Sequence, residues 1–188
     1  MGFLEKIVVN SKLDYWYHKH FGFNRKLRSI QISNNSLILE IGAGAGITST
    51  FIADKFPNSK IIATDFDPAQ VEKAKQKVVR SNIEFRREDA TQLSFPKGYF
   101  DVCFASLVFH HIENFPQAIN EVYRALKSGG RFFIYEIPAK TWNPFWSWFP
   151  LGTPGVFSRD EFTNLLKKVG FKLTKIQGNL PFWAECYK

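Results

Sequence analysis

Three glycines at every second position follow a short apolar stretch, in the segment Leu37–Gly46 (LILEIGAGAG). The stretch 37–41 is partly β-branched and is bounded by polar residues and glycine, which predicts a buried strand. Glycine permits a sharp turn and lets a ligand approach the backbone where a Cβ would block it. Because a helix is predicted from Ile47 on, this is a strand, a turn and a helix. In an open α/β sheet such a turn lies at the carboxyl edge, where ligands bind.

A second predicted strand, Lys60–Thr64, ends at Asp65, which lies 19 residues beyond Gly46. A carboxylate at this place can accept hydrogen bonds from both hydroxyls of a ribose. The alternative is that Asp65 caps the helix that begins near Pro68, although Asp67 is better placed for that role. The sequence therefore predicts a nucleoside site at this edge.

The details of the turn distinguish between nucleoside ligands. A dinucleotide fingerprint requires Gly-x-Gly-x-x-Gly, and here Ile47 stands in place of the last glycine. The acid before the turn, Glu40, would repel a pyrophosphate but suits a cationic ligand. The pattern resembles the first motif of the class I S-adenosylmethionine-dependent methyltransferases, hydrophobic-x-(Asp/Glu)-x-Gly-x-Gly-x-Gly. The resemblance extends from Leu37 to about Pro138 and is closest to the branch of ubiquinone and menaquinone C-methyltransferases.

This resemblance implies S-adenosylmethionine as cofactor, S-adenosylhomocysteine as its product, and a set of contacts. The methionine end would lie on the glycine-rich turn, the ribose on the second strand's end, the adenine on the third, and the sulfonium beside the fourth. The expected cofactor-binding residues are Glu40, Gly42, Ala43, Gly44, Asp65, Phe66, Asp89, Ala90, Ser106 and Leu107. For Asp89 the alternative is a plain helix cap before Thr91.

Apolar patterns and caps predict alternating strands and helices over the rest of the chain. The expected strands are 37–41, 60–64, 82–86, 100–105, 131–137, 171–177 and 181–187, and the expected helices are 47–55, one from 68 on, 113–127 and 158–169. This order predicts an α/β, doubly wound sheet. The resemblance adds a Rossmann-like, seven-stranded order, 3-2-1-4-5-7-6, with strand 7 antiparallel.

We expect one methyltransferase domain over 1–188. Residues 1–30 would form a helical cover, with helices at 2–9 and 12–21, and 31–188 the core. An aromatic segment at 140–157 contains Trp142–Phe149, which is rich in Trp and Phe. It is predicted to be a substrate lid, with satellite core and interfacial anchor as open alternatives.

Methyl transfer from a sulfonium is a direct displacement that depends mainly on alignment, so no metal and no covalent nucleophile is expected. A base is needed only where the acceptor must lose a proton. His110 and His111, after the fourth strand, are weak candidates for that base, and packing or substrate binding is the alternative. The other catalytic residues are not indicated by the sequence.

The composition and charge of the chain limit the kinds of binding partner that we expect. The net charge of +8 comes from scattered Lys and Arg, so nucleic acid is not an expected partner. No apolar stretch reaches the roughly 18 residues of a membrane span, and no signal peptide is recognised. Cys103 and Cys186 are predicted to be reduced core residues. We expect a cytoplasmic protein, with peripheral membrane contact left open and no indication of its oligomeric state.

The expected acceptor is small and partly apolar, of a lipid or quinone-like kind. Three alternatives stay open at this point. One is an RNA methyltransferase that uses the basic surface, and another is an NAD(P)-dependent oxidoreductase on a dinucleotide-binding fold. The third is an inactive nucleotide-binding relative.

Overall fold

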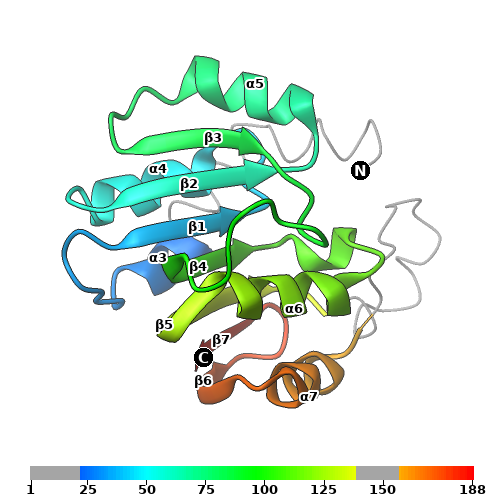
Figure 1. Ribbon diagram of the computed structural model, residues 1–188. Helices are drawn as coiled ribbons and strands as arrows, with labels where there is room; N and C mark the ends of the chain where they lie inside the picture. Colours follow the sequence, from blue (N-terminus) through cyan, green and yellow to red (C-terminus); the bar gives the residue numbers. More distant parts are fainter. Residues whose placement is uncertain (1–21, 139–156) are drawn as a thin grey trace.

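The computed structural model describes residues 22–138 and 157–188, which form a seven-stranded sheet with helices on both faces (Figure 1). The strands are β1 Leu37–Ile41, β2 Lys60–Asp65, β3 Ile83–Arg87, β4 Phe100–Ser106, β5 Leu126–Glu136, β6 Lys172–Gln177 and β7 Phe182–Tyr187. The helices are α3 Phe23–Leu27, α4 Ile47–Lys55, α5 Pro68–Lys77, the 3₁₀ turn η1 Phe109–His111, α6 Phe115–Ala125 and α7 Arg159–Val169.

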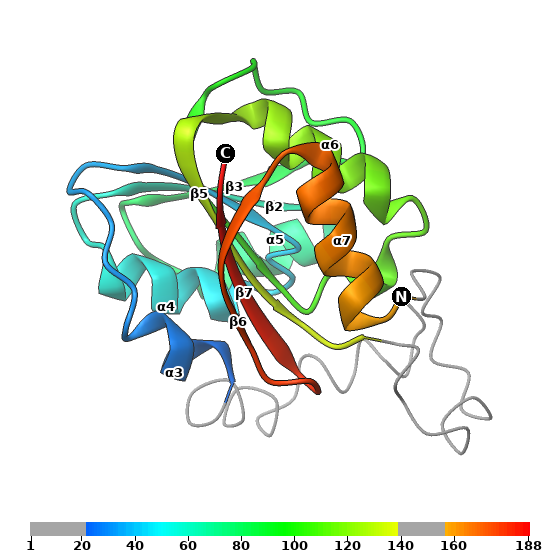
Figure 2. The same cartoon turned by 90° about the horizontal axis from the view of Figure 1, so that it is seen from below.

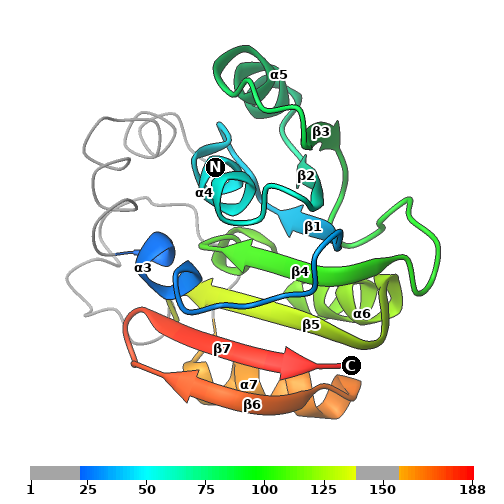
Figure 3. The same cartoon turned by 90° about the vertical axis from the view of Figure 1, so that its left-hand side faces the viewer.

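The strand order is β3-β2-β1-β4-β5-β7-β6. Strands β1 to β5 pair in parallel, whereas β7 is antiparallel to both β5 and β6. The arrowheads of β1, β4 and β5 point one way and that of β7 the other (Figure 3). The predicted fold class, strand order and orientation of strand 7 are all confirmed.

Two apolar clusters lie on the two faces of the sheet, one under α3, α4 and α5 and the other under α6 and α7 (Figure 2). Strand β4 contributes side chains to both clusters. Cys103 and Ala105 belong to the cluster under α6 and α7, and Val102 and Phe104 belong to the cluster under α3, α4 and α5. This alternation explains why the strand is apolar throughout, since a central parallel strand is buried on both faces. Both cysteines are buried and free, as predicted.

The predicted helix caps are present. The Asp67 carboxylate accepts a hydrogen bond from the N–H of Ala69 at the start of α5. Ser158 and Glu161 form a capping box at the start of α7, and Gly170 ends that helix in a left-handed conformation. Such caps satisfy backbone groups that have no partner within the helix.

The boundary between α6 and β5 differs from the prediction. The helix spans Phe115–Ala125 instead of 113–127, and β5 begins directly at Leu126. The register with β4 shifts from Phe100↔Leu126 to Val102↔Arg131. The shift places a bulge in β5 between Leu126 and Arg131, where Gly129 has a φ of 75°.

Two predicted features lie outside the described residues: the helices at 2–9 and 12–21, and the aromatic segment Trp142–Phe149. Of the predicted cover 1–30, the structure describes 22–30, which contain the short helix α3. Its residues Phe23 and Leu27 are buried against the sheet.

Candidate functional site

The turn after β1 is shaped by glycine. Gly42 has a φ of 72° and Gly44 a φ of 52°, in the left-handed region that side chains disfavour. A Cβ at Gly42 would lie 2.6 Å from Cβ of Val108, so only glycine fits there. Among residues 22–138 and 157–188, a Cβ at Gly44 would meet nothing within 4 Å, so no described residue covers this side of the turn. The buried Ala43 between them donates its N–H to the carbonyl of Thr64 at 2.9 Å.

Asp65, at the end of β2, is bonded to this turn. Its Oδ2 accepts the N–H of Gly44 at 2.8 Å, and its Oδ1 accepts the N–H of Asp67 at 2.9 Å. The capping of α5 is done by Asp67, whose Oδ1 accepts the N–H of Ala69 at 2.9 Å. The two acids therefore have different contacts. Asp67 caps α5, as the sequence predicted, and Asp65 is bonded to the glycine-rich turn.

Glu40 lies on β1 directly below the turn and is 1 % exposed. Its Oε2 accepts the hydroxyl of Ser49 from α4, and its Oε1 has no hydrogen-bond partner among the described residues. Burial raises the pKa of Glu40 from 4.5 to about 8; the Ser49 hydrogen bond acts to lower it, and the charge of Asp65 raises it further. A buried carboxyl with one unsatisfied oxygen would be stabilised by a cationic donor.

The ends of β2 and β3 are also adjacent, because the N–H of Glu88 donates to the carbonyl of Asp65 at 3.1 Å. The ring of Phe66 is 64 % exposed and lies 5.7 Å from the guanidinium carbon of Arg87. Asp89 is exposed, and its Oδ1 accepts both the N–H and the hydroxyl of Thr91, at 2.8 and 2.7 Å. No helix begins here, so Asp89 holds a turn and does not cap a helix as the alternative had it.

The segment after β4 follows the same edge. Leu107 has a φ of 54°, and its N–H donates to the carbonyl of Tyr135 on β5 at 2.8 Å. The hydroxyl of Ser106 is buried and makes no hydrogen bond to any described residue. Ala90, after β3, is partly buried against the cluster under α6 and α7. The ten predicted cofactor residues thus occupy the carboxyl ends of four neighbouring parallel strands and the segments that follow them.

Sequence reasoning missed Glu136, the last residue of β5. Its carboxylate is fully buried. Its Oε2 accepts the N–H of Val108 at 3.0 Å and of Phe109 at 2.7 Å, while its Oε1 accepts the N–H of Ile137 at 2.7 Å. The same Oε1 lies 2.5 Å from Nδ1 of His110. An acid at the end of an apolar strand, as at Glu40 and Asp65, was the available signal.

The two histidines are neighbours on η1. Their ring centroids are 4.0 Å apart, and the side chain of His110 is 14 % exposed. Within residues 22–138 and 157–188, no group of three or more His, Cys, Asp or Glu side chains could hold a metal ion. In the same residues, no helix is long and apolar enough to cross a membrane.

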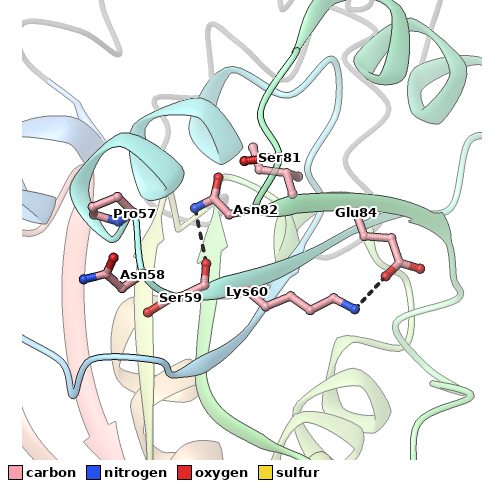
Figure 4. Close-up of a pocket in the computed structure, with 8 residues that line it drawn as sticks. Pro57, Asn58, Ser59, Lys60, Ser81, Asn82 and Glu84 are labelled. Carbon is pink, nitrogen blue, oxygen red and sulfur yellow. Dashed lines mark hydrogen bonds and ion pairs between the residues drawn. The ribbon is translucent and has the colours of Figure 1, made fainter.

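One cavity, of about 440 Å³, lies at the other edge of the sheet, at the amino ends of β2 and β3 (Figure 4). Its walls are tied together, because Asn82 donates to the carbonyl of Ser59 at 3.2 Å and Lys60 pairs with Glu84 at 3.2 Å. The strands are parallel, so this cavity is separated from the glycine-rich turn by their length.

A smaller cavity, of about 270 Å³, lies at the carboxyl edge of β5. It is lined by Arg25, Lys26, Tyr135, Gln177, Gly178, Pro181 and Trp183. Tyr135 is the register partner of Ser106, and both Tyr135 and Trp183 belong to the apolar cluster that includes Ala43 and contacts Leu107. Tyr135 thus connects this cavity to the strand that ends at Ser106, while none of the lining residues is a predicted cofactor residue.

The described residues fit S-adenosylmethionine, whose ammonium and sulfonium are both cationic. The unsatisfied Oε1 of Glu40 offers an acceptor for a cationic donor, and the open side of Gly44 leaves room for a ligand against the backbone. The Asp65 carboxylate stands at the end of the neighbouring strand. Together these features are compatible with a cationic nucleoside at this edge of the sheet.

Comparisons with known proteins agree with this geometry. A family model described as "Methyltransferase domain" matches residues 39–134. The chain is 28 % identical over 135 residues to a demethylmenaquinone methyltransferase of Thermus thermophilus, covering 71 % of this chain and 57 % of the relative. It is 30 % identical over 162 residues to the ubiquinone/menaquinone biosynthesis C-methyltransferase UbiE of Zymomonas mobilis, covering 85 % of this chain and 62 % of the relative.

The chain thus spans about 60 % of the length of each of these two relatives. Among solved structures, an S-adenosylmethionine-dependent methyltransferase from Aquifex aeolicus has the same fold, with a TM-score of 0.81 at 16 % identity over 100 % of this chain and 98 % of that one. The predicted family is confirmed. The chain belongs to the methyltransferase-domain family, within the class I S-adenosylmethionine-dependent methyltransferases.

Proposed function

We propose that this chain transfers a methyl group from S-adenosylmethionine to a small, partly apolar acceptor. The observation that carries the proposal is the arrangement at the end of β1, where the unsatisfied Oε1 of buried Glu40 lies below a turn whose Gly44 is covered by no described residue. When bound, the cofactor would supply a methyl group on a positively charged sulfur. The acceptor would bond to the methyl carbon and displace the sulfur. The protein contributes mainly alignment, and effective molarities of about 10⁵–10⁸ M show how much alignment can contribute.

Each predicted residue has a role in this proposal. Glu40 and the turn of Gly42, Ala43 and Gly44 receive the methionine end, and Glu40 accepts a hydrogen bond from its ammonium. Asp65 binds the ribose hydroxyls. The exposed ring of Phe66 stacks on the adenine, and Asp89 and Ala90 contact its edge. Ser106 and Leu107 lie beside the sulfur.

The cavity of about 270 Å³ supports the proposed character of the acceptor. Its lining is mixed: Tyr135, Pro181 and Trp183 are apolar or aromatic, whereas Arg25, Lys26 and Gln177 are polar, and the Lys26 ammonium donates to Gln177 Oε1 at 2.9 Å. Such a lining suits a planar apolar molecule that carries an acidic hydroxyl or carboxyl group. We therefore propose a lipid or quinone-like precursor, a class that also appears in the names of the relatives.

An apolar acceptor of this kind resides in membranes, so we also propose a cytoplasmic protein with peripheral membrane contact. The net charge of +8 favours approach to an anionic surface. Co-sedimentation with vesicles that contain phosphatidylserine, compared with vesicles of phosphatidylcholine alone, measures this contact. Equal sedimentation with both would remove the electrostatic part of the proposal.

The first experiment is thermal unfolding with S-adenosylmethionine, S-adenosylhomocysteine, NADH and NADPH in turn. A ligand at 100 times its dissociation constant adds about 2.7 kcal/mol to the unfolding free energy. For a domain of this size that raises Tm by several degrees, at roughly 2–4 °C per kcal/mol. We expect a shift with the two sulfur nucleosides only. A shift with NADH or NADPH only would favour the oxidoreductase alternative.

The second experiment measures tritium transfer from methyl-labelled S-adenosylmethionine to a short-chain demethylmenaquinol, with transfer RNA as the competing acceptor. Label in the quinol supports the proposal. Label in the RNA, with a salt-dependent affinity, would favour the RNA methyltransferase alternative. Cofactor binding with no transfer to either would contradict the proposed acceptor class.

A further inference from the structure

The cavity of about 270 Å³ lies between helix α3 and the hairpin of β6 and β7. Figure 3 shows α3 at the end of the sheet where β5 ends and β7 begins. The ring centroid of Phe23 on α3 lies 5.9 Å from that of Trp183, which lines the cavity. The Lys26 ammonium donates to Gln177 Oε1 of the hairpin at 2.9 Å. The packing of α3 on the sheet therefore places Arg25 in the wall of this cavity.

The charge of the cavity lining is positive. Arg25 is exposed, and its guanidinium forms no hydrogen bond or ion pair with any described residue. Among residues 22–138 and 157–188, no Asp or Glu lines the cavity. The Glu185 carboxylate accepts the indole N–H of Trp183 at 2.9 Å, but it is paired with Arg131 and Lys175, at 3.7 and 3.6 Å. The donors of Arg25 are therefore available to an anion that enters the cavity.

Two aromatic side chains of the lining belong to one row across the sheet. Ser106 on β4 is the register partner of Tyr135 on β5, and Tyr135 is the register partner of Trp183 on β7. Register partners project from the same face, and neighbouring strands lie about 4.8 Å apart. The row therefore runs from Ser106, the residue proposed to lie beside the sulfur, to the two rings that line the cavity.

A carboxylate on a flat aromatic ring matches this lining. A guanidinium pairs with a carboxylate through two parallel hydrogen bonds, and aromatic side chains pack against flat rings. A cavity of about 150 Å³ can hold benzene, so about 270 Å³ leaves room for one ring and its substituents. We propose that the cavity binds an aromatic carboxylate, with its ring against Tyr135 and Trp183 and its carboxylate on Arg25. This rests on the proposed function and deepens it, because the bound acid is the methyl acceptor and Arg25 selects it by charge.

The binding test needs no methyl donor. Calorimetry compares para-hydroxycinnamate with its methyl ester, which keeps the ring and loses the charge. The wild-type protein should bind the acid at least about tenfold more tightly than the ester, because only the acid forms a charge-assisted pair. The difference should shrink as NaCl is added, since Arg25 is exposed and salt screens its charge. Equal affinities for acid and ester, or no binding of the acid, would overturn the proposal.

Variants of two arginines on the same short helix assign this binding to one guanidinium. Arg25→Gln should lower the affinity for the acid about tenfold or more and leave that for the ester unchanged. Arg25→Lys keeps the charge without the planar fork and should recover part of the affinity. The matched control is Arg28→Gln, because Arg28 is exposed at the C-terminal end of α3 and does not line the cavity. Full affinity in Arg25→Gln, or an equal loss in Arg28→Gln, would overturn the proposal.

The kinetic test uses methyl-labelled S-adenosylmethionine with the same acid and ester. An oxygen or ring carbon of the acceptor bonds to the methyl carbon, the bond from that carbon to sulfur breaks with both electrons left on sulfur, and the acceptor's proton goes to solvent. Arg25→Gln should raise KM for the acid about tenfold, with kcat and KM for S-adenosylmethionine unchanged. Transfer to the ester as efficient as to the acid would overturn the proposal.

The two tests also separate this proposal from the proposed function. Methyl transfer to a short-chain demethylmenaquinol that para-hydroxycinnamate does not inhibit would overturn the assignment of the cavity to the acceptor. A wild-type protein that binds the acid through Arg25 but transfers a methyl group to none of these compounds would contradict the proposed function instead. In that case the calorimetry still establishes the cavity as a site for an aromatic carboxylate.

Discussion

Gly42 and Val108 are in direct contact between the turn after β1 and the segment after β4. A Cβ placed on Gly42 would lie 2.6 Å from Cβ of Val108 and nearer still to its Cγ2. The two segments belong to neighbouring parallel strands, and their contact closes the carboxyl edge at that point. The first glycine of the turn is thus required by packing, whereas a Cβ at Gly44 would meet no described residue.

We predict that Gly42→Ala destabilises the fold. The methyl group would both collide with Val108 and force a non-glycine residue to a φ of 72°. Strain and overpacking together should cost about 2–5 kcal/mol of unfolding free energy. Urea unfolding followed by circular dichroism measures the loss. A variant as stable as the wild type would show that the two segments separate readily.

Gly44→Ala should act on binding more than on stability. Its own cost is the left-handed backbone, about 1–2 kcal/mol, because no atom of a described residue obstructs the new methyl group. Gly98→Ala is the matched control, since Gly98 has a φ of 68°, is likewise unobstructed by the described residues and lies in a turn before β4. We expect similar losses of stability in both variants. Weaker binding of S-adenosylhomocysteine, by calorimetry, should appear in Gly44→Ala alone.

The buried Glu40 should make stability fall as pH rises. Its folded pKa, about 8, lies above the ordinary value of 4.5, so the folded state binds the proton more tightly. The stabilisation is therefore complete below about pH 4.5 and is lost as pH rises through 8, by up to about 5 kcal/mol. Glu40→Gln keeps a partner for Ser49 and removes this dependence. Urea unfolding at pH 5.5 and pH 8.5 should show a smaller difference in Glu40→Gln than in the wild type.

The same residue couples ligand binding to proton release. A cationic group at the unsatisfied oxygen of Glu40 favours the ionised carboxylate and lowers its pKa. At pH 7, binding of S-adenosylmethionine should therefore release a proton, and affinity should rise towards pH 8. Calorimetry in buffers of different ionisation enthalpy counts the protons. An unchanged count in Glu40→Gln would mean that another group titrates.

Substitutions of Asp65 and Asp67 should separate an effect on ligand binding from an effect on the stability of the fold. Asp65→Ala removes the proposed ribose acceptor and should weaken S-adenosylmethionine binding at least tenfold, which is about 1.4 kcal/mol. Asp67→Ala removes the cap of α5 and should cost about 1 kcal/mol of stability with affinity unchanged. Calorimetry and thermal unfolding of both proteins provide the comparison. Full affinity in Asp65→Ala would exclude the ribose assignment.

The sheet could be predicted from the sequence because its signals are local or periodic. Apolar runs marked β1, β2 and β4, and the side chains of Asp67, Ser158 and Glu161 marked two helix starts. The end of α6 was placed two residues late, because the pairing of β4 with β5 extends the strand back to Leu126. Helix propensity alone does not contain that pairing, which is a long-range contact.

The site was predictable only in part. The glycine-rich turn and the acids at the ends of β1 and β2, Glu40 and Asp65, follow directly from their spacing. Glu136 was missed because its role depends on a loop 28 residues earlier in the chain, whose N–H groups it binds. The left-handed Leu107 was also unpredictable, since leucine has no preference for that conformation and is held there by its bond to Tyr135. The acid at the end of β5 is a local signal, but the partners that it binds 28 residues earlier are not visible in any local pattern.

The hydrogen bonds to Glu136 have a consequence for the order in which the molecule opens. The amides of Val108 and Phe109 lie at the start of a short irregular segment, where exchange with solvent hydrogen is usually fast. Here they are tied to a buried acceptor on β5, so they exchange only when that part of the sheet itself opens. The segment beside the proposed reaction centre should therefore open as rarely as the central strands do. An incoming acceptor then meets a surface that became ordered when the chain folded.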